Sequence, residues 1–260
     1  MAGPSVARLD LARVVRVVPD VPAINKEFDY LVPDHLGHEV RIGAMVRIEL
    51  HGRRVGGWVV ADRVTPPTNV SLRPLRKVTG WGPPTDLVDL SSWAAWRWAG
   101  RRSAFLRTAS PETAIRALPS AGFGTPPAAG DEMAIIEEAF ATDDGRVVLR
   151  LPPAAELLSV VLAAARRGPA LVVAPSVATV ATMAAGLRRA HVRVATVPRE
   201  WAQAAAGAQV VMGARAAAWA PCPGMAAVVV LDGHDEGLQQ EQTPTWNGWV
   251  VAAERAARAG

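Results

Sequence analysis

The second half of the chain alternates short apolar runs with longer segments of helical character. The runs PALVVAP (169–175), VRVATV (192–197) and MAAVVVLD (225–232) read as strands, whereas AAELLSVVLAAARRG (154–168) and SVATVATMAAGLRRAH (176–191) read as helices. Continuous apolar strands that alternate with helices are typical of a parallel sheet covered on both faces. The pattern therefore predicts an α/β fold whose chemistry lies at the carboxyl ends of the strands.

The same pattern gives four finer predictions. GRVVLRLP (145–152) and AQVVMGARAA (208–217) should be further strands of this sheet. Gly168 should end the first helix, and Ser176 should cap the N-terminus of the second.

The first half has a different, Val-rich pattern with Gly-bearing turns, which indicates a small antiparallel sheet or barrel of four or five strands. HGRR (51–54) is expected to be a tight turn, and PPT (66–68) should end the sheet. A helix over residues 85–100 should begin at Thr85 or Asp86 as its N-cap. The expected strands cover residues 12–19, 28–32, 38–50 and 53–64.

A stretch rich in Pro, Gly and Ala, PSAGFGTPPAAG (119–130), separates the two patterns and reads as a linker. We therefore predict an OB-like, β-rich domain over residues 1–118, with a β core over about 5–80 and a helical segment over 85–118. A linker region over 119–145 should lead into an incomplete α/β lobe over 146–260.

Charge is distributed unevenly between the halves. Residues 1–120 contain 17 Lys and Arg against 11 Asp and Glu, whereas residues 121–260 contain 11 against 13. A basic N-terminal half favours a polyanionic partner, although many basic surfaces bind nothing. Cys222 is the single cysteine, which excludes a disulfide framework and a zinc cage of this chain's thiols. No apolar run approaches the roughly 20 residues of a membrane span, so we expect a cytoplasmic protein without a membrane partner.

Segments in both halves carry a family resemblance. FDYLVPDHL (28–36) and IGAMVRIELHGRRVGGWVV (42–60), followed by AQVVMGARAAAWAPCPGMAAVVVLDGHD (208–235), stand in the order found in primosomal protein N′, the replication-restart helicase family PriA. The spacings Gly213-x-Arg215-x-Ala217 and Ala220-Pro221-x-Pro223 are also shared. The chain resembles an N-terminal portion or fragment from a degenerate branch of that family, with residues 146–260 as a RecA-like helicase lobe.

The resemblance implies a pocket for the 3′-terminal nucleotide of a nascent strand. A carboxylate can accept a hydrogen bond from a 3′-hydroxyl and repels a 3′-phosphate, while aromatic rings can stack on a base. The alternative is structural, with Phe28 in the core and Asp29 capping a turn. The pocket residues implied are Phe28, Asp29, Tyr30 and Gly52, with Arg76 or Lys77 behind the carboxylate and Arg53 and Arg54 on the DNA backbone.

The motor motifs of the family are degraded. Where the family has a phosphate loop, LRLPPAAELLSVV (149–161) has neither glycine nor lysine. Asp232 survives as a remnant of the metal and ATP motif, but Gly233 and His234 follow it in place of the water-activating glutamate. The family binds ATP with magnesium, and zinc in a region absent here, so we expect no catalytic residue, metal or cofactor in this chain.

Three functions follow, in order of preference. The first is a DNA-binding replication-restart protein that recognises a nascent 3′ end at a stalled or branched fork without helicase activity. The second is an ATP-dependent 3′–5′ DNA helicase, and the third is a protein-interaction scaffold. The resemblance implies forks with a 3′ end, other primosome proteins and single-stranded-DNA-binding protein as partners. The tryptophans Trp93, Trp96 and Trp98 could stack on DNA, but we expect them to be partly buried.

Overall fold

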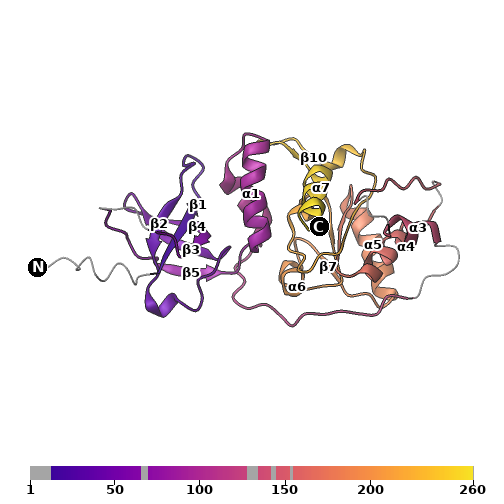
Figure 1. Cartoon of the computed structure of the whole chain (residues 1–260), viewed down its shortest axis with the longest axis horizontal. Helices are drawn as coiled ribbons and strands as arrows, with labels where there is room; N and C mark the ends of the chain where they lie inside the picture. Colours follow the sequence, from indigo (N-terminus) through magenta and orange to yellow (C-terminus); the bar gives the residue numbers. More distant parts are fainter. Residues whose placement is uncertain (1–12, 66–69, 128–133, 142–144, 153–154, 260) are drawn as a thin grey trace, which may run out of the picture. The chain divides into compact units, whose positions relative to one another are not determined.

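The computed structural model describes residues 13–65, 70–127, 134–141, 145–152 and 155–259. The chain divides into two compact units, Met1–Ala117 and Leu118–Gly260 (Figure 1). The expectations for residues 5–12 and for PPT at 66–68 lie outside the described residues. None of the described helices is both long enough and apolar enough to cross a lipid bilayer.

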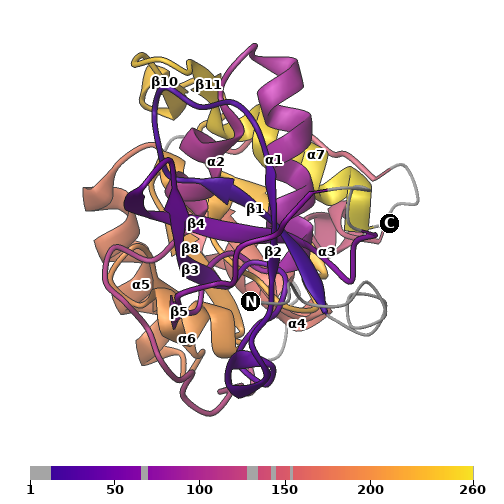
Figure 2. The same ribbon diagram turned by 90° about the vertical axis from the view of Figure 1, so that its left-hand side faces the viewer.

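The N-terminal unit contains one five-stranded antiparallel sheet with the order β2-β1-β4-β3-β5. Residues 73–75 join its two edges, because the Leu31 amide donates to the Arg73 carbonyl (3.0 Å) and the Leu75 amide donates to the Leu31 carbonyl (2.9 Å). The strands therefore curl around a common interior, as a small barrel does (Figure 2). The strands are β1 (Val14–Pro19), β2 (Phe28–Leu31), β3 (Met45–Leu50), β4 (Arg53–Asp62) and β5 (Lys77–Gly80).

Alternate residues of these strands fill that interior, as the period of two requires. A short 3-10 helix, η2 (Asp34–Leu36), adds Leu36 to this cluster. The antiparallel β-rich architecture expected for this half is confirmed, whereas the finer OB-like description stays a prediction. The buried members of the interior are Val15, Val17, Tyr30, Leu36, Val40, Ala44, Val46, Ile48, Val59, Leu75 and Val78.

Two helices, α1 (Thr85–Arg97) and α2 (Arg102–Ala109), cover part of the outer face of the sheet. Val88 of α1 and Leu106 of α2 pack against outward-facing strand residues, among them Val18, Trp58 and Val60. The Trp58 indole also donates to the Ser110 hydroxyl (2.8 Å). The helix at 85–97 is confirmed, but its expected cap is wrong, because Thr85 is already helical and follows Pro84 without a side-chain cap bond.

The C-terminal unit contains a parallel four-stranded sheet with the order β7-β8-β6-β9. Helices α4 and α5 cover one face, and α7 lies on the other (Figure 1). The predicted parallel α/β layering is thus confirmed, whereas a RecA-like identity stays a prediction. The main elements are α4 (Leu157–Arg167), β6 (Ala170–Val173), α5 (Val177–Arg189), β7 (Val194–Thr196), β8 (Val210–Gly213), β9 (Ala227–Val230) and α7 (Gly248–Ala259).

Shorter elements complete this unit, and one of them, α3, lies inside the segment that the composition predicts as a linker. These elements are α3 (Ala134–Ala139), α6 (Trp201–Ala206), η4 (Arg215–Trp219), η5 (Glu236–Leu238), β10 (Gln239–Gln240) and β11 (Trp246–Asn247).

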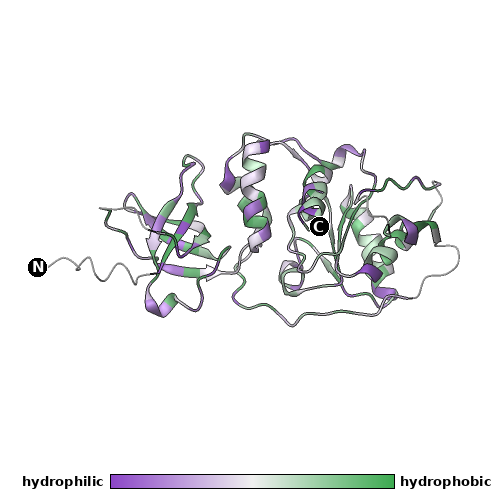
Figure 3. Cartoon of the chain, viewed as in Figure 1, coloured by the Kyte–Doolittle hydropathy of each residue, from purple (hydrophilic) through white to green (hydrophobic). Residues whose placement is uncertain are grey.

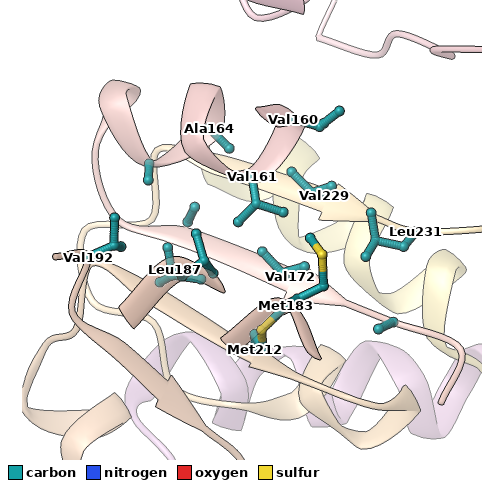
Figure 4. Packing of buried hydrophobic residues seen from close by; sticks show 14 of the residues in the cluster. Val160, Val161, Ala164, Val172, Met183, Leu187, Val192, Met212, Val229 and Leu231 are labelled. Carbon is teal, nitrogen blue, oxygen red and sulfur yellow. The ribbon is translucent and has the colours of Figure 1, made fainter. Parts of the chain in front are cut away.

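The core of this unit forms between the sheet and helices α4 and α5 (Figure 4). Val161 from α4 and Leu187 from α5 meet Val172 of β6, one of the two inner strands, and all three are fully buried. Both helix boundaries follow the predicted chemistry. Ser176 caps α5 by accepting from the Thr179 amide (3.1 Å), and α4 ends before Gly168, which has a positive φ of 140°.

Three sequence-based boundaries are wrong. Residues 145–152 form no strand and pair with none of the described strands, and Val148 is 86% exposed while Leu149 and Leu151 pack on the core. Residues 38–44 precede β3 rather than form part of it. Past Ala109 the expected helical segment is no longer helical, and the Trp81 amide instead donates to the Ile115 carbonyl (2.7 Å).

Candidate nucleic-acid interface

The triplet Phe28-Asp29-Tyr30 lies on β2, whose alternation sends its side chains to opposite faces. Tyr30 points into the barrel with 4% of its surface exposed, and its hydroxyl donates to the Glu49 carbonyl (3.0 Å). Burial raises the pKa of this phenol. Phe28 is half-buried and packs on the same interior. The two rings therefore do not flank the carboxylate, and Tyr30 offers no ring face for stacking.

Asp29 points outward, where Arg16 on β1 lies directly opposite it. The Arg16 guanidinium donates through Nε to Oδ1 (2.8 Å) and through Nη2 to Oδ2 (3.1 Å). The side chain of Asp29 is 8% exposed, whereas that of Arg16 is 40% exposed. The bidentate bond raises the pKa of Arg16 and holds the carboxylate in one orientation. Each carboxylate oxygen keeps a second lone pair for another donor.

The cation behind Asp29 is thus Arg16, and the expectation that Arg76 or Lys77 plays this part is wrong. Arg76 instead forms an ion pair with Glu49, which also pairs with Arg73. The hydrogen bond from Arg76, followed by the charges of Arg73, Arg76 and Arg54, lowers the pKa of Glu49 below its ordinary value. Lys77 is exposed and lies opposite Arg47 in the β3–β5 pair.

A shallow hollow of about 250 Å³ opens beside this ion-pair cluster. Its lining consists of Glu49, Arg73, Pro74 and Arg76. It lies next to β2, because Leu31 pairs with Pro74 and the Tyr30 hydroxyl bonds to the Glu49 backbone. The fold therefore brings β2, the end of β3 and residues 73–76 together at one place.

The turn between β3 and β4 is a two-residue hairpin loop, as expected for HGRR. His51 and Gly52 both have left-handed backbone angles, with φ of 49° and 76°. A Cβ atom on Gly52 would meet nothing within 4 Å, so this backbone faces open space. Arg53 and Arg54 follow at the start of β4, where both side chains are exposed and Arg54 lies opposite Glu49.

Sequence reasoning missed three charged residues of this surface, namely Arg16, Glu49 and Arg73. Arg16 could have been found from the alternation of β1, since it is the one polar residue in VVRVVP. Glu49 and Arg73 become partners only through the closure of the barrel by residues 73–75, which no local pattern signals.

The remnant of the ATP motif lies in the other unit. Asp232 follows β9 with a left-handed φ of 47°, and its carbonyl accepts from the Asp235 amide (2.8 Å). The Asp235 carboxylate caps η5 by accepting from the Gly237 amide (2.7 Å). Within the described part of the chain, no three His, Cys, Asp or Glu side chains are grouped to hold a metal ion.

Residues 16–111 match the family model described as PriA 3′DNA-binding domain (3′BD). Proteins named "Probable replication restart protein PriA", from two strains of Mycobacterium tuberculosis and from Mycobacterium bovis, are 36% identical to this chain over 93 residues. The matched region is 35% of this chain and 14% of each relative, so the chain corresponds to a small part of their length. The resemblance to the PriA family is therefore confirmed through its 3′DNA-binding domain.

Proposed function

We propose, from the match of residues 16–111 to the family model described as PriA 3′DNA-binding domain, that this chain binds the 3′ end of a nascent DNA strand at stalled or branched forks. The observation that carries the proposal is the fixed carboxylate of Asp29. It lies within the matched residues, outside the barrel core, and in one orientation set by Arg16.

The chemistry of end recognition follows from this carboxylate. Its spare lone pairs can accept a hydrogen bond from a terminal 3′-hydroxyl, and such charge-assisted bonds are stronger than neutral ones. A 3′-phosphate in the same place would bring two anions together and weaken binding. Arg16 contributes in two ways, since it holds the carboxylate of Asp29 in one orientation and presents a partly exposed cation to the last phosphodiester.

The strand next to the end would contact the basic groups around the hollow. Arg53, Arg54 and Lys77 are exposed, and Arg73 and Arg76 keep more than half of their side chains exposed beside Glu49. Glu49 offsets part of this positive charge, and its ion pairs hold Arg73 and Arg76 in place. In this proposal Phe28 and Tyr30 support β2 from inside, and Gly52 lets the DNA backbone approach the hairpin.

The proposed context is replication restart, with other primosome proteins and single-stranded-DNA-binding protein as partners in the cytoplasm. The C-terminal unit would serve as a RecA-like scaffold that does not hydrolyse ATP. Two features support this part of the proposal: the parallel sheet, and the segment before α4, which offers no glycine-rich loop to cradle phosphates.

Fluorescence anisotropy tests the end site with two forks, one ending in a 3′-hydroxyl and one in a 3′-phosphate at the same salt concentration. We expect the phosphate to weaken binding about tenfold or more, equivalent to about 1.4 kcal/mol. Asp29→Asn should lose most of this preference, whereas Asp34→Asn, an exposed acid of the same unit, should keep it. Equal affinity of the native protein for both forks would show that the FDY triplet is only structural.

A further inference from the structure

Trp96 is the most exposed tryptophan of the chain. It lies in the last turn of α1 with 79% of its surface exposed, whereas Trp249, the next most exposed, reaches 43%. Figure 3 shows that α1 carries both hydrophilic and hydrophobic bands, as expected of a helix with one buried side. The buried side consists of Leu87, Val88, Leu90, Ser91 and Ala94, so Trp96 belongs to the opposite side.

Aromatic contacts between neighbouring residues hold the end of α1 that carries Trp96. Trp98 packs edge-to-face on Trp93 (5.2 Å between ring centroids) and against Phe105 of α2 (6.2 Å). Trp93 precedes Trp96 by three residues, a spacing that makes their side chains neighbours on the helix surface. The helix ends immediately afterwards, where Ala99 has a left-handed φ of 47° and the Gly100 amide donates to the Ala95 carbonyl (3.0 Å).

Cations follow Trp96 along the chain. Arg97 is exposed, with its guanidinium carbon 5.8 Å from the centre of the Trp98 ring, and Arg101 is exposed just before α2. The exposed acids of α1, Asp86 and Asp89, lie seven or more residues toward the other end of the helix. The Trp96 end of α1 therefore combines an open indole face with positive charge.

These features favour single-stranded DNA over a protein partner. Thr85, Asp89 and Ser92 share the exposed stripe with Trp96, so the helix offers no continuous apolar face for a partner helix. An isolated aromatic ring beside arginines instead suits an unpaired base, which stacks on the ring while its phosphates contact the cations. A fully paired duplex does not expose base faces in this way.

We propose that Trp96, with Arg97 and Arg101, forms a second site that binds the body of a single strand, separate from the 3′-end site. The inference rests on the proposed DNA-binding function but not on end recognition, because base stacking needs no terminal hydroxyl. It therefore predicts binding that survives when the 3′ end is blocked.

Anisotropy with a 5′-labelled 20-nucleotide oligothymidine ending in a 3′-phosphate tests this site in the full chain. Because the blocked end disfavours the Asp29 site, Trp96→Ala should weaken binding about fivefold or more. Trp96→Phe should retain most of the affinity, since a smaller ring can still stack. Trp249→Ala is the matched control, because it removes an exposed tryptophan from the other unit and should change little. Unfolding curves of each variant should match the native curve, since Trp96 supports no core contact.

A second probe separates this proposal from that of the end site. A four-nucleotide oligothymidine with a free 3′-hydroxyl should lose affinity with Asp29→Asn and keep it with Trp96→Ala. If Trp96→Ala leaves the blocked 20-nucleotide strand bound as tightly as before, the second site is overturned while the end site stands. If the native protein ignores the 3′-phosphate but Trp96→Ala still weakens binding, end recognition fails and the second site stands.

Discussion

The guanidinium of Arg13 donates hydrogen bonds to two separate segments of the N-terminal unit. Its guanidinium donates to both carboxylate oxygens of Asp62 (2.8 Å each) and to the carbonyls of Gly37 (2.6 Å) and Val40 (2.7 Å). One side chain thereby joins the beginning of β1 to the end of β4 and to the segment that follows η2. Several carbonyl and carboxylate groups would lose their donor together if it were removed.

We expect Arg13→Ala to lower the free energy of unfolding by about 2–4 kcal/mol, because partly buried acceptors would be left unpaired. Arg13→Lys should recover little, since an ammonium cannot reproduce the bidentate geometry. Lys26→Ala, in an exposed loop, is the control and should change stability by less than about 0.5 kcal/mol. Urea denaturation at neutral pH measures all three, and a loss for Arg13→Ala as small as the control's would contradict the argument.

The same pair gives stability an acid-side pH dependence. The hydrogen bond from Arg13 lowers the pKa of Asp62 and outweighs the opposing effect of burial. Because the folded pKa lies below the unfolded one, the stabilisation is complete above about pH 4 and is lost as the pH falls through the folded pKa. Asp62→Asn should therefore narrow the gap between stability at pH 7 and at pH 3. An unchanged gap would mean that other carboxylates, Glu49 among them, account for it.

In the β3–β4 hairpin, the effect of Gly52 on stability can be measured separately from its proposed part in DNA binding. Gly52 adopts a φ of 76° with open space around its missing side chain, so replacement by alanine has a backbone cost without a steric clash. We expect Gly52→Ala to lower stability by about 1 kcal/mol, and Gly52→Asn to lower it less, since asparagine tolerates this region.

The two Gly52 variants also test its proposed part in the DNA site. If the backbone edge must stay bare, both should weaken binding of a fork with a 3′-hydroxyl, although only alanine costs much stability. Equal binding by the asparagine variant and the native protein would restrict Gly52 to a turn-forming role. Thermal unfolding and anisotropy on the same samples distinguish these outcomes.

Local sequence patterns predict those helices, strands and turns whose conformation is determined by their own residues. β1, β4 and α5 follow from alternation, helical periodicity and the Ser176 cap, and the β3–β4 turn follows from His51-Gly52. β5 could not be read in the same way, because four residues, KVTG, become a strand only by pairing with β3. The strand predicted over residues 145–152 is wrong for the converse reason. Leu149 and Leu151 are apolar because they pack on the core, although the segment pairs with no strand among the described residues.

The candidate site shows the same limit. Asp29 could be singled out from FDYLVP, and the period of two already implied that its aromatic neighbours point the other way. Arg16 could be noticed as the one polar residue of β1, but its pairing with Asp29 could not be predicted from sequence, because that pairing depends on the β1–β2 register. The Glu49 cluster depends on residues 24 and 27 positions away, which only the closed barrel brings together.

For the whole molecule, the proposal assigns DNA recognition and scaffolding to different units. Residues 149–161, which comprise the segment before α4 and the first residues of that helix, contain no glycine or lysine, and Asp232 is followed by Gly233 rather than an acid. We therefore expect millimolar ATP with magnesium to leave the thermal unfolding temperature within about 1 °C of its value without nucleotide, because a bound ligand would raise it. An upward shift that depends on ATP concentration would favour the helicase alternative.

The division between the units gives a sharper test. Residues 16–111 of this chain, which match the family model, fall within the unit Met1–Ala117. This unit has its own barrel interior, and its own two helices cover part of the sheet. A fragment of residues 1–117 should therefore fold cooperatively and prefer a 3′-hydroxyl over a 3′-phosphate to the same extent as the full chain. Residues 118–260 alone should show no such preference, since Asp29 and Arg16 are absent. If the short fragment folds but loses the preference, the C-terminal unit takes part in recognising the end, and scaffolding alone does not describe its role.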